Sequence, residues 1–266
     1  NDLGPLITKH PDVAKVSFTG STMVGKLIME SAAPSLKRLT LELGGNDAGI
    51  VLDDVNVEEI AMPLFMAGFY NSGQICIALK RLYVHDSIYD DLVNALAKIA
   101  ATVPMNEGFA DGVLLGPMQN RKQYDKVQAM IEQAKLDGKV LQDGPVPEGN
   151  GYFIRPTIVR DISDGTQLVD EEQFGPVMPI IRYTNLEEAI ASANRLDVGL
   201  GASVWSGDIE RAKEVALQIE AGTVWINKHA DLAPNVPFSA TKMSGIGVEL
   251  GQHGLNEFTQ IKVINV

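Results

Sequence analysis

The sequence has little cysteine and no paired histidines. Cys76 is the one cysteine among 266 residues, which excludes an intramolecular disulfide and a zinc site made of several thiolates. The sequence also lacks the Gly-x-Ser-x-Gly pattern of many serine hydrolases. No His-x-x-x-His pair is present, so we expect no metal ion in catalysis; the four histidines are His10, His85, His229 and His253.

Positive charge and long apolar runs are scarce as well. The net charge is −12, and no basic cluster is longer than Lys37-Arg38 or Lys80-Arg81. Nucleic acids and anionic membrane surfaces bind basic patches, so we expect neither as a partner. The longest apolar run, around residues 60–70, contains Pro63 and is too short to cross a bilayer. The first residues show no basic-then-apolar signal pattern, and we expect a cytoplasmic protein.

What the sequence does contain is a regular alternation of two kinds of pattern. Strand patterns cover residues 16–18, 38–42, 48–52, 81–84, 140–141, 154–159, 177–183, 202–205, 223–226 and 260–266. Helical patterns lie between them, over residues 22–33, 57–70, 88–101, 119–136, 186–194 and 209–219. Strands that alternate with helices predict an α/β fold with a mostly parallel sheet and flanking helices.

A glycine turn joins the first predicted strand to the first predicted helix. It reads Phe18-Thr19-Gly20-Ser21-Thr22. Such a turn lets the backbone approach a ligand closely, and the free N–H groups of the helix start favour an anion. Ser21 or Thr22 also fits a plain helix N-cap, which the local pattern alone favours. The spacing matches neither a P-loop nor the Rossmann fingerprint.

Glu42 and Cys76 are the two residues best placed for acid–base and nucleophilic chemistry. Glu42 ends an apolar strand and precedes Gly44-Gly45; burial there would raise its pKa and suit a general base, although a solvent-facing carboxylate fits equally. A lone cysteine is more often a small buried apolar residue. Cys76, however, follows the polar loop Asn71-Ser72-Gly73-Gln74, whose N–H groups suit a developing oxyanion. Residues 170–177 are by composition a solvated acidic loop.

Taken together and in order, these segments resemble the aldehyde dehydrogenase superfamily. The resemblance covers residues 5–266 and lacks the family's N-terminal half. The segments that carry it are Phe18-Thr19-Gly20-Ser21, Leu41-Glu42-Leu43-Gly44-Gly45, Gly73-Gln74-Ile75-Cys76, Glu172-Gln173-Phe174-Gly175-Pro176, Pro237-Phe238, Lys242-Met243-Ser244-Gly245 and Gly254-Leu255-Asn256-Glu257-Phe258-Thr259. Where the family usually has Pro-Phe-Gly-Gly, this sequence has Pro-Phe-Ser-Ala at 237–240, and we expect the mouth of the substrate route to differ there.

The resemblance implies an NAD(P)-dependent oxidation of a small aldehyde to a carboxylic acid. It assigns Cys76 as the nucleophile that forms a thiohemiacetal and then a thioester, and Glu42 as the base that activates water. It implies NAD or NADP as the cofactor, with NAD slightly favoured, and a homodimer or homotetramer. The implied cofactor contacts are Gly20, Ser21, Val24, Leu43, Glu172 and Phe174, and the implied substrate-lining residues are Phe69, Tyr70 and Phe238.

The same resemblance predicts three parts and leaves two alternatives. Residues 1–44 would be the end of a Rossmann-like cofactor domain, 45–245 the catalytic domain, and 246–266 a C-terminal segment with an oligomerisation strand. One alternative is a coenzyme A-acylating aldehyde dehydrogenase, against which Glu42 argues because such enzymes typically lack this base. The other is a non-catalytic fragment that serves only in assembly through an unpaired strand at 260–266.

Overall fold

The main sheet of this computed structural model has seven strands in the order β10-β9-β3-β4-β7-β6-β5, and all neighbours are parallel except β5 and β6. The structure describes residues 3–266. The strands are β1 (Lys15–Thr19), β2 (Arg38–Glu42), β3 (Asp47–Val51), β4 (Leu79–His85), β5 (Lys139–Leu141), β6 (Thr157–Arg160), β7 (Val177–Tyr183), β8 (Val198–Gly199), β9 (Gly201–Trp205), β10 (Thr223–Ile226), β11 (Phe238–Ser239), β12 (Thr241–Lys242), β13 (Gly245–Ile246) and β14 (Val248–Glu249).

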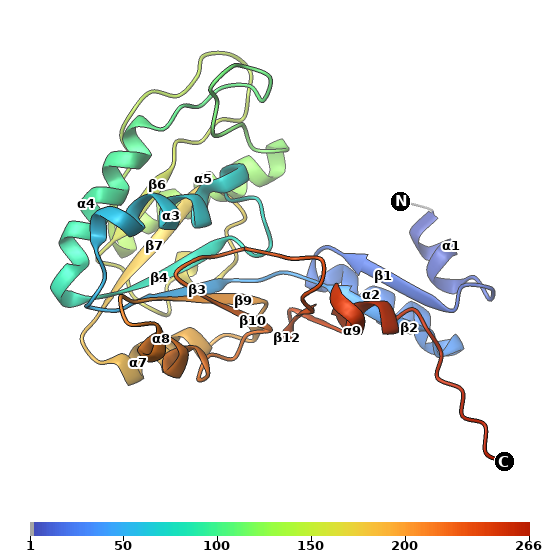
Figure 1. Cartoon of the computed structure of the whole chain (residues 1–266). Coiled ribbons are helices and arrows are strands. Elements are labelled where there is room, and N and C mark those ends of the chain that lie inside the picture. The colour runs from blue at the N-terminus through green and yellow to red at the C-terminus, as the bar shows by residue number, and fades with distance from the viewer. Residues whose placement is uncertain (1–2) are drawn as a thin grey trace.

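Helices cover both faces of the main sheet (Figure 1). They are α1 (Leu3–Lys9), α2 (Thr22–Ala32), α3 (Val57–Phe69), α4 (Asp86–Thr102), α5 (Arg121–Asp137), α6 (Gln167–Asp170), α7 (Leu186–Asn194), α8 (Ile209–Ala216) and α9 (Gly251–Asn256), with short 3-10 turns at Ala33–Ser35 and Tyr70–Gly73. No helix among residues 3–266 is both long enough and apolar enough to cross a membrane.

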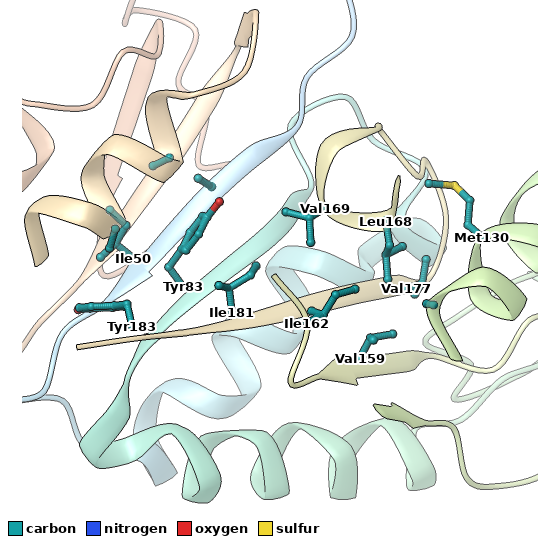
Figure 2. Packing of buried hydrophobic residues seen from close by; sticks show 14 of the residues in the cluster. Ile50, Tyr83, Met130, Val159, Ile162, Leu168, Val169, Val177, Ile181 and Tyr183 are labelled. Atoms are coloured by element: carbon teal, nitrogen blue, oxygen red, sulfur yellow. The ribbon is translucent and has the colours of Figure 1, made fainter. Parts of the chain in front are cut away.

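Successive side chains of the central strands pack into two different cores, as the period of two in a strand requires. Ile50 of β3 and Tyr83 of β4 belong to the core under α5, α7 and α8, part of which Figure 2 shows. The next residue in each strand, Val51 and Val84, belongs to the core under α3 and α4. A sheet buried on both faces has no solvent side, and this explains the continuous apolar runs of its strands.

A smaller sheet forms the second body, on the right in Figure 1. β1 and β2 are parallel, and β13 returns from the end of the chain to lie antiparallel to β2. α2, which packs Ile28 against Val16 and Leu41, covers this sheet. The register pairs Gly245 with Glu42, so residues on both sides of the proposed boundary at 245 belong to one sheet. The three proposed parts remain a prediction.

The predicted α/β fold with a mostly parallel sheet is confirmed. Three of its element predictions need correction. The strand predicted at 154–159 begins at Thr157, and the helix predicted to end at 219 ends at Ala216. The strand predicted at 260–266 is wrong, because these residues form no strand and are exposed. An extended apolar segment becomes a strand only when a neighbouring edge supplies hydrogen bonds.

Candidate active site

A cavity of about 730 Å³ brings together segments that are far apart in the sequence. The small sheet contributes the turn after β1 and the end of β2, and the larger body contributes the Cys76 loop, α5 and the loop before β7. The lining residues are Thr19, Gly20, Ser21, Leu43, Gly44, Gln74, Ile75, Cys76, Gln123, Lys126, Glu171, Glu172 and Phe174. Six of the residues predicted from the sequence therefore share one cavity.

The loop before Cys76 has an unusual backbone. Asn71, Ser72 and Gly73 have φ of 51°, 54° and 70°, in the left-handed region that residues other than glycine rarely adopt. Hydrogen bonds hold the loop in place, since Ser72 Oγ donates to the Gly116 carbonyl at 2.7 Å. Such a sequence of strained residues persists only where surrounding contacts fix it, and it is common at functional sites. The loop thus holds Cys76 at the cavity wall in a fixed position.

The Cys76 thiol is partly buried, and burial raises its pKa above the ordinary value. The positive charge of Lys80 acts in the opposite direction, while Asp47 and Glu172 add to the rise. The thiol is consequently protonated at neutral pH in this state. It needs a proton acceptor or a stronger positive charge before it can attack a carbonyl carbon.

Glu42 is a buried carboxyl group without a hydrogen-bond partner. Its side chain is 3% exposed, and neither carboxyl oxygen is paired within residues 3–266. Burial, with repulsion from Glu249, raises its pKa to about 8. The next two residues, Leu43 and Gly44, line the cavity with Cys76. A carboxyl group with this pKa can accept a proton near neutral pH, which is the property that a general base needs.

The turn at Gly20 and Ser21 is a helix N-cap that also lies at the cavity wall. Ser21 is the N-cap of α2, and its hydroxyl accepts a 3.4 Å hydrogen bond from the Val24 N–H. Ser21 also lines the cavity, and its contact with a cofactor stays a prediction. Gly20 N–H donates to the Glu42 carbonyl at 3.0 Å, which ties the turn to β2. Val24 does not line the cavity and instead packs with the core of the small sheet.

Glu172 and Phe174 line the same cavity as that turn. Phe174 has φ of 51°, which keeps this half-buried ring at the cavity wall. Glu172 Oε1 accepts a 2.6 Å hydrogen bond from Lys80 Nζ. Gly44 leaves room for this carboxylate, because a Cβ at position 44 would lie 2.6 Å from Glu172 Oε2.

Sequence reasoning missed three polar residues of the site. Lys80 is buried and paired with Glu172. Gln123 and Lys126, three residues apart on α5, line the cavity and donate to the main-chain carbonyls of the Glu172 loop. The spacing of Gln123 and Lys126 places them on one face of a helix, but the sequence does not show which surface that face meets. Within residues 3–266, no group of three or more potential metal-ligand side chains gathers in space.

The three predicted substrate-lining residues lie in different surroundings. Phe69 is fully buried and stacks on Phe65 at 4.6 Å, so its placement on the substrate route is wrong: its ring fills the core under α3. Tyr70 is 59% exposed and lines a second cavity of about 350 Å³ together with Ile75, the residue before Cys76. Phe238 is buried in a small cluster against which Cys76 packs.

Comparisons with known proteins agree with this arrangement. Human aldehyde dehydrogenase 1A1 is 41% identical over 265 residues, which are 99% of this chain and 53% of the relative. A mutant of an aldehyde dehydrogenase from Bacillus cereus is 40% identical with a TM-score of 0.93, over 97% of this chain and 53% of that one. A mutant of aldehyde dehydrogenase C from Pseudomonas syringae, solved with NAD+ and octanal, is 35% identical with a TM-score of 0.91, over 96% and 53%.

The chain thus spans about half the length of the curated relatives that it matches. Residues 1–264 match the sequence model of the aldehyde dehydrogenase family. This match extends over nearly the whole chain, and the chain therefore belongs to the aldehyde dehydrogenase family.

Proposed function

We propose that this chain is the catalytic part of an NAD(P)-dependent dehydrogenase that oxidises an aldehyde to a carboxylic acid. The observation that carries the proposal is that the one cysteine lies in a cavity with the Gly20–Ser21 turn and Glu172, beside the end of β2 where Glu42 is buried. Thioester hydrolysis needs a thiol and a base that activates water, and Glu42 is a buried acid two residues before Gly44 of the cavity wall. Because the chain spans half of its relatives, the activity belongs to the longer protein that contains it.

The residues around the cavity fit the phosphate and nicotinamide ribose part of a dinucleotide. The N–H groups at the start of α2 face an anion favourably, and Ser21 adds a hydroxyl. Glu172 adds a carboxylate to the same cavity, and Gly44 keeps the space beside it free. The dinucleotides of relatives in the solved complexes are NAD+, and we propose NAD over NADP on that ground.

Each residue then has a defined task. The Cys76 thiol gives its proton to solvent water, and the thiolate sulfur bonds to the aldehyde carbon, which gives a thiohemiacetal alkoxide. The bound nicotinamide supplies the acceptor for the hydride that leaves this carbon, and the product on Cys76 is a thioester. Glu42 takes a proton from water, the resulting hydroxide adds to the thioester carbon, and the C–S bond breaks to release the carboxylic acid and the Cys76 thiolate.

Glu42 also supports water rather than coenzyme A as the acyl acceptor. A thiol acceptor carries its own ionisable proton, whereas water needs a base to become a nucleophile. A buried carboxyl group with a pKa of about 8 supplies that base.

We further propose a homo-oligomer in the cytoplasm. The apolar tail is exposed, with Ile261, Val263 and Ile264 each at least 75% accessible, and such a segment suits pairing with a strand edge of a second copy. The single cysteine forms no intramolecular disulfide, which is the usual state of cytosolic proteins.

Replacing the nucleophile tests the proposal. The Cys76→Ser variant of the full-length protein should lose more than about 10³-fold in aldehyde oxidation, since a serine hydroxyl is hardly ionised at neutral pH. NADH formation from an aldehyde panel measures this. The variant should keep the wild-type melting temperature, because the change is nearly isosteric. Aldehyde oxidation retained in Cys76→Ser would refute the proposed function.

A further inference from the structure

Lys80 is a buried cation that the reaction scheme above does not use. Its side chain is 3% exposed, and its Nζ lies 2.7 Å from the Cys76 carbonyl oxygen, 3.2 Å from the Gly45 carbonyl oxygen and 2.6 Å from Glu172 Oε1. An ammonium group has three protons, so all three are donated. Burial of such a charge is unfavourable unless it is paired and hydrogen-bonded. Lys80 therefore joins three segments: the nucleophile loop, the β2–β3 connection and the Glu172 loop.

The two oxygens of Glu172 lie in different surroundings. Oε1 accepts from Lys80 and, at 3.5 Å, from the Gly45 N–H. Oε2 lies over Gly44 and has no hydrogen-bond partner within the part of the chain that the structure describes. The Glu172 side chain is 29% exposed and lines the cavity. One oxygen is thus anchored, and the other is free to accept from a ligand hydroxyl.

We propose that Lys80 is a positioning residue that ties the Cys76 main chain to the Glu172 carboxylate, so that the nucleophile and the ribose-binding acid share one geometry. The inference rests on the proposed function for the identity of the ligand at Glu172. It does not rest on that function for the contacts themselves, which join groups of this chain.

The charge of Lys80 also acts on the thiol. Asp47 on β3 and Glu172 both raise the Cys76 pKa, and Lys80 opposes them. His229, from the loop after β10, lies 3.6 Å from Asp47 and 2.8 Å from the Ile77 carbonyl. Lys126 on α5 lines the cavity too, but it donates to the Glu172 main chain. Lys80 is accordingly the cation in direct contact with the residue that carries the thiol.

Alkylation of Cys76 by iodoacetamide in the intact protein, followed between pH 6.5 and 9.5 by mass spectrometry of the Cys76 peptide, tests this role. Lys80→Met keeps the length of the side chain and removes the charge. It should shift the alkylation profile to higher pH and slow the reaction at pH 7.5 by about fivefold, because the thiolate fraction falls tenfold per pKa unit. Lys122→Met, an exposed lysine on α5, is the matched control and should leave the profile unchanged.

Glu172→Gln is the second arm, and it should shift the profile to lower pH because Lys80 would then be uncompensated. A profile unmoved in Lys80→Met, or moved equally in Lys122→Met, overturns the proposal. If Lys80→Met does not fold, an unmoved profile in Glu172→Gln overturns it instead. Alkylation needs neither aldehyde nor dinucleotide, so this result stands apart from the Cys76→Ser activity test that decides the proposed function.

Discussion

Glu42 and Cys76 are single residues whose chemistry depends on burial. Both have raised pKa values, and in both the largest cause is the loss of water around the ionised form. The local sequence predicts that Glu42 is a candidate base, since it ends an apolar strand before two glycines. It does not predict the contribution of Glu249, which the return of the chain along β2 brings near.

The raised pKa of Glu42 makes a prediction about stability. The carboxyl group of the unfolded chain ionises near 4.5, and that of the folded chain near 8. Between these values the folded state holds a proton that the unfolded state has lost, so the free energy of unfolding falls as pH rises from 4.5 to 8. Glu42→Gln removes this loss. The free energy of unfolding of Glu42→Gln minus that of the wild type should therefore be about 1–3 kcal/mol larger at pH 8.5 than at pH 5. Urea unfolding at the two pH values measures the difference.

Glu58→Gln is a suitable control for that measurement, because Glu58 is exposed in the first turn of α3. Its stability relative to the wild type should hardly depend on pH. An equal pH dependence in Glu42→Gln and the wild type would show that the pKa of Glu42 is not raised in the folded protein.

At the scale of elements, most strands and helices follow from the sequence pattern alone. β2, β7, β10 and α7 begin and end where their patterns predict. The pattern predicts these elements correctly because each is buried on one face or on both, and the spacing of its apolar residues reflects that burial.

The elements that the pattern misses are those whose order depends on distant segments. β13 and β14 have two residues each, too few for any period, and their partners are β2 and β11. Lys80 is a similar case at the start of β4. The sequence shows only a lysine beside an arginine, while its burial depends on Glu172, ninety-two residues later.

The start of α2 carries a prediction of its own. Ser21→Ala removes the N-cap hydroxyl, and the free energy of unfolding should fall by about 0.5–1 kcal/mol, the low end for such caps, because the bond is long and exposed. Thr102→Ala is the comparison variant, since its hydroxyl bonds within the last turn of α4. Thermal or urea unfolding should show the loss in Ser21→Ala alone; equal losses in both variants would contradict a specific capping role.

At the scale of the whole molecule, the residues that line the cavity in this structure all belong to the 266-residue chain. The relatives are about twice as long, and the proposed dinucleotide would make further contacts in a protein of that length. We predict that the 266-residue chain binds NAD+ at least about tenfold more weakly than the full-length protein, a loss of about 1.4 kcal/mol or more. Calorimetric titration of both proteins checks this, and equal dissociation constants would contradict it.

The return of β13 along β2 has a consequence for synthesis. Glu42 leaves the ribosome before Gly245 and Glu249, and it stays open to water until these two residues have also emerged, because they cover and charge its surroundings. A nascent chain that stops before residue 245 would therefore carry an ordinary carboxylate at position 42. The raised pKa of Glu42 therefore arises only after the chain has been made through Glu249, and products that stop earlier lack it.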